Sequence, residues 1–266
     1  IKFGSIAIPL IIICIFGVII LVKLLIKKVP ISSKMSYLIA IGTSVCGATA
    51  IVATAPVINA KKSEVAYAIA NITLFGVIAM IVYPYFAEWY FDNDALKTGL
   101  FLGTSIHETS QVAAAGLIYD QQFNSPETLN VATVTKLIRN TFLVILIPLF
   151  AFLYNRGELK GQNYSILSIF PYFVIGFIGM IVVRNIGDQF FTADSNNYGL
   201  WVNLIGYLKT LATVFLTMAM AAVGISINLS ELKSMGYKPF VVGLIAAITV
   251  GFISLIYIET LNKFIY

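Results

Sequence analysis

A histidine and a glutamate stand side by side at His107 and Glu108, inside a segment of otherwise apolar and small residues. His107 is the only histidine among the 266 residues. A membrane protein keeps an ionisable side chain at depth where it faces a partner, a cavity or a substrate. Glu108 could carry a proton or ligate sodium as a carboxylate, and His107 could bind an anion when protonated or relay a proton. The pair is therefore the centre of a candidate site.

Both residues also have a structural interpretation, with Glu108 in a buried helix–helix hydrogen bond and His107 as a hydrogen-bonded core histidine. Zinc is not expected, because one histidine, one adjacent carboxylate and two distant cysteines lack the ligand spacing. No nucleophile elbow accompanies the pair, and no Gly-x-x-x-x-Gly-Lys loop indicates ATP-driven pumping. We expect a protein that is not an enzyme and has no cofactor beyond a coupling Na+ or H+.

The segment around His107 has a counterpart earlier in the chain. Gly42–Ala53 aligns without gaps on Gly103–Ala114, with Gly-Thr-Ser in common and close matches at other positions. An internal repeat gives this pattern, and so does chance identity among small residues. Gln111 joins Glu108 as a candidate for ion coupling. Six hydroxyls are candidates for substrate binding, and each could instead be a packing residue or bond back to its own helix. They are Thr43, Ser44, Thr49, Thr104, Ser105 and Thr109.

Two basic residues follow the second repeat at a helical spacing. Lys136 and Arg139 are three residues apart, so they share one face of a helix. One interpretation is attraction of an anion, since arginine can hold an oxyanion through two hydrogen bonds. The alternative is that both side chains snorkel to the membrane interface.

Composition places these residues in a membrane protein. Hydrophobic residues make up 59% of the chain and charged residues 11%, whereas a soluble domain has about 25% charged residues. In a membrane protein, lysines and arginines are concentrated in cytoplasmic loops, so the net charge of +5 does not indicate nucleic-acid binding. We expect an all-α, polytopic membrane helix bundle with eight apolar segments of spanning length. They are Ile1–Ile26, Tyr37–Ile58, Val65–Phe86, Thr98–Ile118, Val131–Tyr154, Ile166–Val183, Leu200–Ile227 and Phe240–Ile258.

Loop charges favour one arrangement of these segments. If all eight cross, lysine-rich loops fall on opposite sides, against the positive-inside rule. If residues 37–58 and 98–118 each enter and leave on one side, the charges sort by face. Basic loops then hold Lys23 to Lys34, Lys61/Lys62, Arg156/Lys160 and Lys233/Lys238, and acidic loops hold Glu88/Asp92/Asp94, Asp120/Glu127 and Asp188/Asp194. Both segments are then broken or re-entrant and pseudo-symmetric; full-length broken helices that cross remain the alternative if an upstream segment changes the count.

Broken helices suit anion binding, because a helix N-terminus near the midplane presents N–H groups and a positive dipole end. Transporters use this geometry for anionic substrates, while freed carbonyls and side chains hold a coupling cation. The glycines of both repeats permit the break.

Five motifs in this order carry a family resemblance: Gly42-Thr43-Ser44-Val45-Cys46-Gly47-Ala48, Ala55-Pro56-Val57-Ile58, Ser105-Ile106-His107-Glu108-Thr109-Ser110-Gln111-Val112, Lys136-Leu137-Ile138-Arg139 and Ala219-Met220-Ala221-Ala222-Val223-Gly224. Over nearly the whole chain the sequence resembles the YeiH-type membrane proteins, often labelled sulfate exporters. The resemblance implies kinship with bile-acid and sodium symporter-type carriers, an elevator-type secondary transporter and, by analogy, a homodimer. Those carriers bind sodium with an acid and a glutamine; Glu108 and Gln111 are similar in kind, at a shorter spacing.

The sequence thus predicts a single transmembrane transporter domain over residues 1–266, with further spans expected upstream because the chain begins with Ile1 in an apolar run. With the resemblance, its substrate is a small inorganic or sulfur-containing anion, coupled to a cation gradient across the bacterial cytoplasmic (inner) membrane. The lipid bilayer is its other partner. Two alternatives are a passive anion channel and a non-transporting subunit of a larger assembly, which a dry, packed region at Glu108 would favour.

Overall fold

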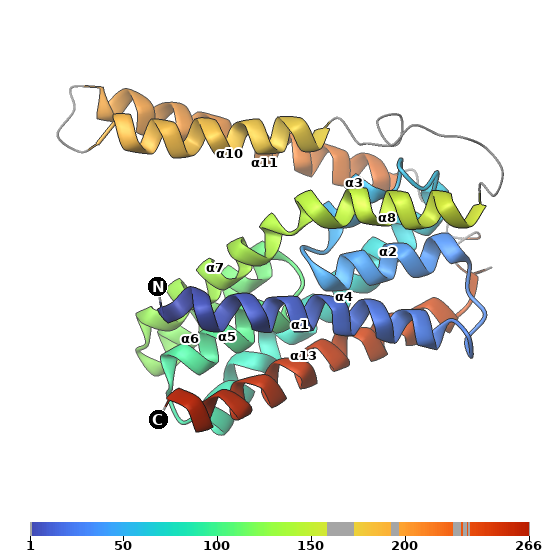
Figure 1. Cartoon of the computed structure of the whole chain (residues 1–266), viewed down its shortest axis with the longest axis horizontal. Helices are drawn as coiled ribbons and strands as arrows, with labels where there is room; N and C mark the ends of the chain where they lie inside the picture. The colour runs from blue at the N-terminus through green and yellow to red at the C-terminus, as the bar shows by residue number, and fades with distance from the viewer. Residues whose placement is uncertain are drawn as a thin grey trace.

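The computed structural model describes residues 2–158, 173–192, 197–225, 230, 233 and 235–265. Over these ranges the chain is helical and contains no β-strand (Figure 1). The all-α prediction is therefore confirmed for the described residues. The helices are α1 (Lys2–Leu25), α2 (Ser33–Ser44), α3 (Ala48–Thr54), α4 (Lys62–Phe91), α5 (Ala95–Ser105), α6 (Thr109–Phe123), α7 (Pro126–Thr141), α8 (Leu143–Glu158), α10 (Phe173–Phe190), α11 (Tyr198–Ile225) and α13 (Lys238–Ile265).

Within the part of the chain that the structure describes, four stretches of helix are long and apolar enough to cross a membrane. They are Gly4–Leu25, Lys62–Phe91, Pro126–Phe150 and Lys238–Thr260. They match the first, third, fifth and eighth of the predicted apolar segments. The prediction of eight segments of spanning length is therefore confirmed for these four only. Residues 37–58 and 98–118 instead form helices that are interrupted near their middles. The first part of the predicted segment 166–183 lies outside the described residues.

The two interruptions fall at corresponding positions of the sequence repeat. Helix α2 ends at Ser44 and α3 begins at Ala48, while α5 ends at Ser105 and α6 begins at Thr109. Three residues therefore leave the helix in each half, directly after Gly-Thr-Ser. In the first half the break depends on Gly47, whose φ of 67° lies in the left-handed region that favours glycine.

Each interrupted pair of helices returns to the end from which it started. For α2–α3, Lys34 Nζ donates to Asn59 O at 2.7 Å, and Ser32 Oγ donates to Glu64 Oε1 at 2.5 Å. These bonds join the start of α2 to residues that follow α3. We call α2 with α3 the first hairpin.

For α5–α6, Tyr119 Oη near the end of α6 donates to Glu88 Oε2 at 2.5 Å, close to the start of α5. We call α5 with α6 the second hairpin. Glu64 and Glu88 lie at opposite ends of α4, so the two hairpins are attached to opposite ends of this helix.

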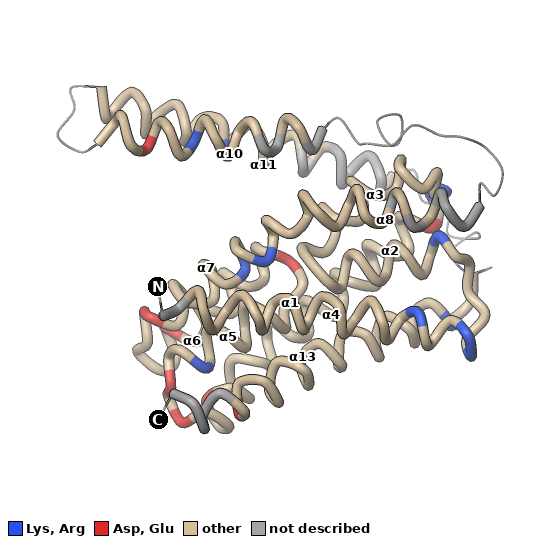
Figure 2. Tube along the Cα trace, in the orientation of Figure 1, with Lys and Arg blue, Asp and Glu red and all other residues tan. Residues whose placement is uncertain are grey.

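Most charged residues at these two ends are sorted by sign (Figure 2). The exceptions are Glu64, at the start of α4, and Lys97, which pairs with Asp94 at 3.3 Å at the other end. The starts of α2, α4 and α13 lie together, because Tyr67 Oη bonds Gly236 O at 2.8 Å and Asn71 Nδ2 bonds Pro239 O at 2.9 Å. This end carries Lys34, Lys61, Lys62 and Lys238. The other end of α4 carries Glu88, Asp92 and Asp94. Lys160 and Asp194 lie outside the described residues.

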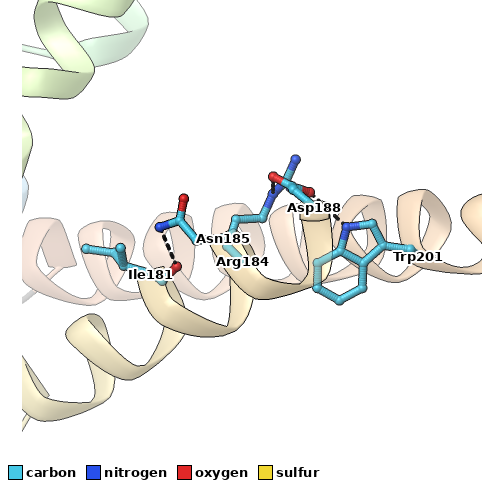
Figure 3. A network of polar contacts seen from close by, with 5 residues as sticks. All are labelled: Ile181, Arg184, Asn185, Asp188 and Trp201. Atoms are coloured by element: carbon cyan, nitrogen blue, oxygen red, sulfur yellow. Dashed lines mark hydrogen bonds and ion pairs between the residues drawn. The ribbon is translucent and has the colours of Figure 1, made fainter. Parts of the chain in front are cut away.

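Helices α10 and α11 form a hairpin beside the rest of the bundle (Figure 1). Near its turn, Arg184 Nε donates to Asp188 Oδ2 at 2.6 Å, and Trp201 Nε1 donates to Asp188 Oδ1 at 2.8 Å (Figure 3). The bond from Trp201 ties α11 to α10, whereas the bond between Arg184 and Asp188 lies within α10. The side chains of the Ala219–Gly224 motif in α11 lie outside the described residues.

Replacing Gly47 by alanine should destabilise the first hairpin. A Cβ added at Gly47 would come 2.3 Å from Glu108 Oε1, and the left-handed backbone penalises any Cβ by about 1–2 kcal/mol. We expect Gly47→Ala to lower the free energy of unfolding by at least that amount, measured by thermal or denaturant unfolding in detergent.

Gly206→Ala is the matched control, because a Cβ at Gly206 meets nothing within 4 Å. It should leave stability unchanged or raise it slightly, since alanine is the better helix former. Equal stability of Gly47→Ala and the wild type would show that the break does not need a left-handed residue.

Candidate functional site

Helix α7 carries two cations into the middle of the protein. The side chains of Lys136 and Arg139 are both 0% exposed, and their spacing places them on one face of the helix, as expected. This burial excludes the alternative in which they snorkel to the membrane interface. Helix α7 packs against both halves of the second hairpin, so the two side chains face the breaks in the helices.

Both cations donate to backbone carbonyls at the ends of α2 and α5. Lys136 Nζ donates to Val45 O at 2.8 Å, Ile106 O at 2.9 Å and His107 O. Arg139 donates to three further carbonyls. Its Nε bonds Ser44 O at 2.7 Å, its Nη1 bonds Thr104 O at 2.5 Å, and its Nη2 bonds Thr43 O. We call this set of two cations and six carbonyls the carbonyl clamp.

The carbonyl clamp supplies hydrogen-bond donors to the buried C-terminal ends of α2 and α5. The last carbonyls of a helix have no partner within the helix, and together they carry about half a negative charge. Here two such ends meet inside the protein, where unpaired carbonyls are costly. Lys136 and Arg139 supply both the donors and the opposite charge.

The carbonyl clamp also limits how Lys136 could bind a substrate. An ammonium group has three N–H donors, and all three point to carbonyls. A direct hydrogen bond from Lys136 to an anion would require one of these bonds to break. Arg139 has five N–H groups and three carbonyl partners. Direct contact of Lys136 and Arg139 with a substrate stays a prediction. Their positive charge acts on the region of the helix breaks whether or not they touch a substrate.

Glu108 connects the second hairpin to the first. It occupies the N-cap position of α6, yet its Oε1 accepts a hydrogen bond at 2.5 Å from the backbone N–H of Ala48, at the start of α3. Its side chain lies against Gly47, its counterpart in the repeat. The helix–helix hydrogen bond of the structural interpretation is therefore present. Glu108 is also partly exposed, so the surrounding residues do not fully enclose its side chain.

The hydroxyls of the two Gly-Thr-Ser motifs divide into two kinds. Ser44 Oγ bonds back to Ala40 O at 2.5 Å, and Thr104 Oγ1 bonds to Leu100 O and to Ser254 Oγ, both at 2.7 Å. Thr43 Oγ1 and Ser105 Oγ are buried and have no hydrogen-bond partner in the part of the chain that the structure describes. Thr49 is exposed, in the first turn of α3.

Two further candidates are buried with a polar atom left over. His107 is 1% exposed and Gln111 is 7% exposed. Among the described residues, His107 Nδ1 and Gln111 Oε1 lack hydrogen-bond partners. Gln111 Nε2 donates to Thr73 O at 3.3 Å, and its amide packs on Gly76, so this side chain faces α4. Native proteins rarely leave such atoms unpaired, and a bound ligand or water is one explanation.

One residue at the site has no counterpart among the predicted ones. Asn140 Nδ2 donates to Thr109 Oγ1 at 3.1 Å, at the start of α6. Its position four residues after Lys136 places it next to Lys136 on α7, and this spacing could have indicated it.

The comparisons with known proteins give the family. Residues 1–243 match the model of the family described as conserved hypothetical protein 698. A UPF0324 membrane protein of Fusobacterium nucleatum is 34% identical over 96% of this chain and 75% of its own length. Similar proteins of the same name occur in Streptococcus agalactiae (34% identity, 91% and 69% covered) and Streptococcus pneumoniae (32%, 93% and 70%). No solved structure matches. The chain belongs to the UPF0324 membrane protein family.

Removing one cation of the carbonyl clamp should destabilise the protein strongly. Lys136→Met keeps an unbranched side chain but leaves three buried carbonyls without a donor. At about 1 kcal/mol for each lost bond, we expect the free energy of unfolding to fall by about 3 kcal/mol or more. Lys62→Met, at an exposed position at the start of α4, is the control. If the two variants unfold at the same temperature in detergent, the carbonyl clamp does not hold the helix ends.

Proposed function

We propose that this protein is a secondary transporter of a small anion, inorganic or sulfur-containing, across the cytoplasmic membrane, coupled to a cation gradient. The observation that carries the proposal is the meeting of two interrupted hairpins at the carbonyl clamp, with unpaired buried polar atoms and one partly exposed carboxylate beside it. Interrupted helices with polar groups between them are how transporters build substrate sites at membrane depth.

The proposed membrane orientation follows from helix length and charge. Helix α4 has 30 residues, which at 1.5 Å per residue is about 45 Å and enough to cross a bilayer. We place its lysine-bearing end in the cytoplasm by the positive-inside rule. The two hairpins then enter from opposite faces as re-entrant, pseudo-symmetric elements, and their breaks lie near the midplane.

The chemistry of the helix ends favours an anion as substrate. A broken helix offers a negative carbonyl end, suited to cations, and a positive N–H end, suited to anions. The carbonyl ends of α2 and α5 are occupied by Lys136 and Arg139. The positive ends remain, at the starts of α3 and α6. That of α3 is bonded to Glu108, whereas no side chain caps α6.

Glu108 is the residue we assign to coupling. It is the acid at the breaks, it is partly exposed, and it contacts both hairpins. A proton or a sodium ion on its carboxylate would weaken its bond to Ala48 and so change the contact between the hairpins. Coupling requires this kind of differential interaction with two states.

The direct test is uptake into proteoliposomes. Labelled sulfate, sulfite, bicarbonate and small sulfonates would be offered under imposed sodium or proton gradients. We expect uptake of at least one of these anions to depend on a gradient. Uptake that only follows the anion's own gradient would indicate a channel, and no uptake of any anion would contradict the proposal.

Glu108→Gln should remain folded but lose gradient-coupled uptake, because the amide keeps the shape and cannot bind the proton or cation. Glu127→Gln, at an exposed position in the first turn of α7, should transport like the wild type. Elution as a single peak in size-exclusion chromatography would confirm folding. Coupled uptake that persists at the wild-type rate in Glu108→Gln would remove Glu108 from the mechanism.

A further inference from the structure

The charges around the helix breaks can be counted. Lys136 and Arg139 each contribute one positive charge, and Glu108 contributes one negative charge when ionised. His107, buried beside two cations, is counted as the neutral imidazole, because an additional buried charge would be costly. The side chains alone leave one positive charge.

The partial charges of the four helix ends at the breaks must be added to this count, and they show where the remaining positive charge lies. The carbonyl ends of α2 and α5 carry about half a negative charge each, and the N-termini of α3 and α6 carry about half a positive charge each. The two positive charges of the carbonyl clamp outweigh the two half-negative carbonyl ends by about one charge. The negative charge of Glu108 balances that excess. About one positive charge remains, from the two N-termini, and only that of α3 is bonded to Glu108.

The free positive end is the start of α6, and independent features beside it are suited to a ligand. No side chain caps this 15-residue helix. In its first turn Ser110 is exposed, so a ligand can reach the turn, whereas the side chain of Gln111 faces α4. The break before it holds Ser105 and His107, each 1% exposed and each with a polar atom that lacks a partner among the described residues.

We infer that the N-terminus of α6, with Ser105 and His107, binds a small oxyanion that carries a single negative charge while Glu108 is ionised. This inference rests on the proposed transport function and narrows its substrate class. One negative charge neutralises the site. A second negative charge would be uncompensated in a buried site, where the repulsion between like charges is only weakly screened.

A dianion is accommodated only if Glu108 loses its charge. One proton or one sodium ion on the carboxylate adds one positive charge to the site, which then balances two negative charges. A dianion would therefore travel with one more cation than a monoanion of the same shape. The number of accompanying cations differs by one because only one repeat supplies a carboxylate, at Glu108, whereas the other has Gly47 at the same position.

Methanesulfonate and sulfate form a matched pair for the test, because both are tetrahedral and similar in size but carry one and two negative charges. Their affinities for the purified full chain would be measured by calorimetric titration at pH 7.5, with N-methylglucamine as the cation. We expect the wild type to bind methanesulfonate at least tenfold more tightly than sulfate. Glu108→Gln should change this ratio at least tenfold in favour of sulfate, and Glu127→Gln should keep the wild-type ratio.

A wild type that prefers sulfate, or a ratio unchanged in Glu108→Gln, would overturn the inference. The wild-type ratio decides the question even if Glu108→Gln fails to fold. Gradient-coupled uptake of both anions without a charge preference would overturn this inference alone. If neither anion binds and no anion is taken up, the proposed function falls with it.

Discussion

The arrangement depends on the hydrogen bonds from two buried cations to six carbonyls at the ends of two helices. An interrupted helix inside a membrane protein leaves carbonyl groups that neither water nor the helix can pair. Lys136 and Arg139 pair them for α2 and α5 at once, so one face of α7 fixes both hairpins. Because the negative helix ends are neutralised, the positive ends and the unpaired hydroxyls are the groups left to hold the anion of the proposed function.

The two halves of the site are similar in backbone and different in chemistry. Both repeats break directly after Gly-Thr-Ser, and in both the helix resumes after three non-helical residues. At the last position of the break, one half has Gly47 and the other Glu108, and these two residues touch. A Cβ at Gly47 would occupy the space of the carboxylate. Glycine in one repeat therefore makes room for the acid of the other, and a single carboxylate contacts both halves.

Much of this site could be predicted from the sequence, because its signals are local. The Gly-Thr-Ser repeats indicated where helices break, and the three-residue spacing indicated that Lys136 and Arg139 share a face. The partners of these cations could not be predicted, because Val45 O and Ser44 O lie 91 and 95 residues away along the chain. The same holds for the bond between Glu108 and Ala48, 60 residues apart. Hydrophobicity alone likewise did not separate full spans from interrupted ones, since both are built from apolar and small residues.

The central claim is that an anion binds where the helices are interrupted, and site-directed labelling tests it most directly. Ser110→Cys places a thiol at an exposed position in the first turn of α6, while the native Cys14 and Cys46 are buried. The rate of labelling by a membrane-impermeant thiol reagent would be measured in proteoliposomes with and without methanesulfonate, with chloride replaced by gluconate throughout. The account predicts that methanesulfonate slows labelling in a concentration-dependent way. A labelling rate that is the same at all anion concentrations would contradict it.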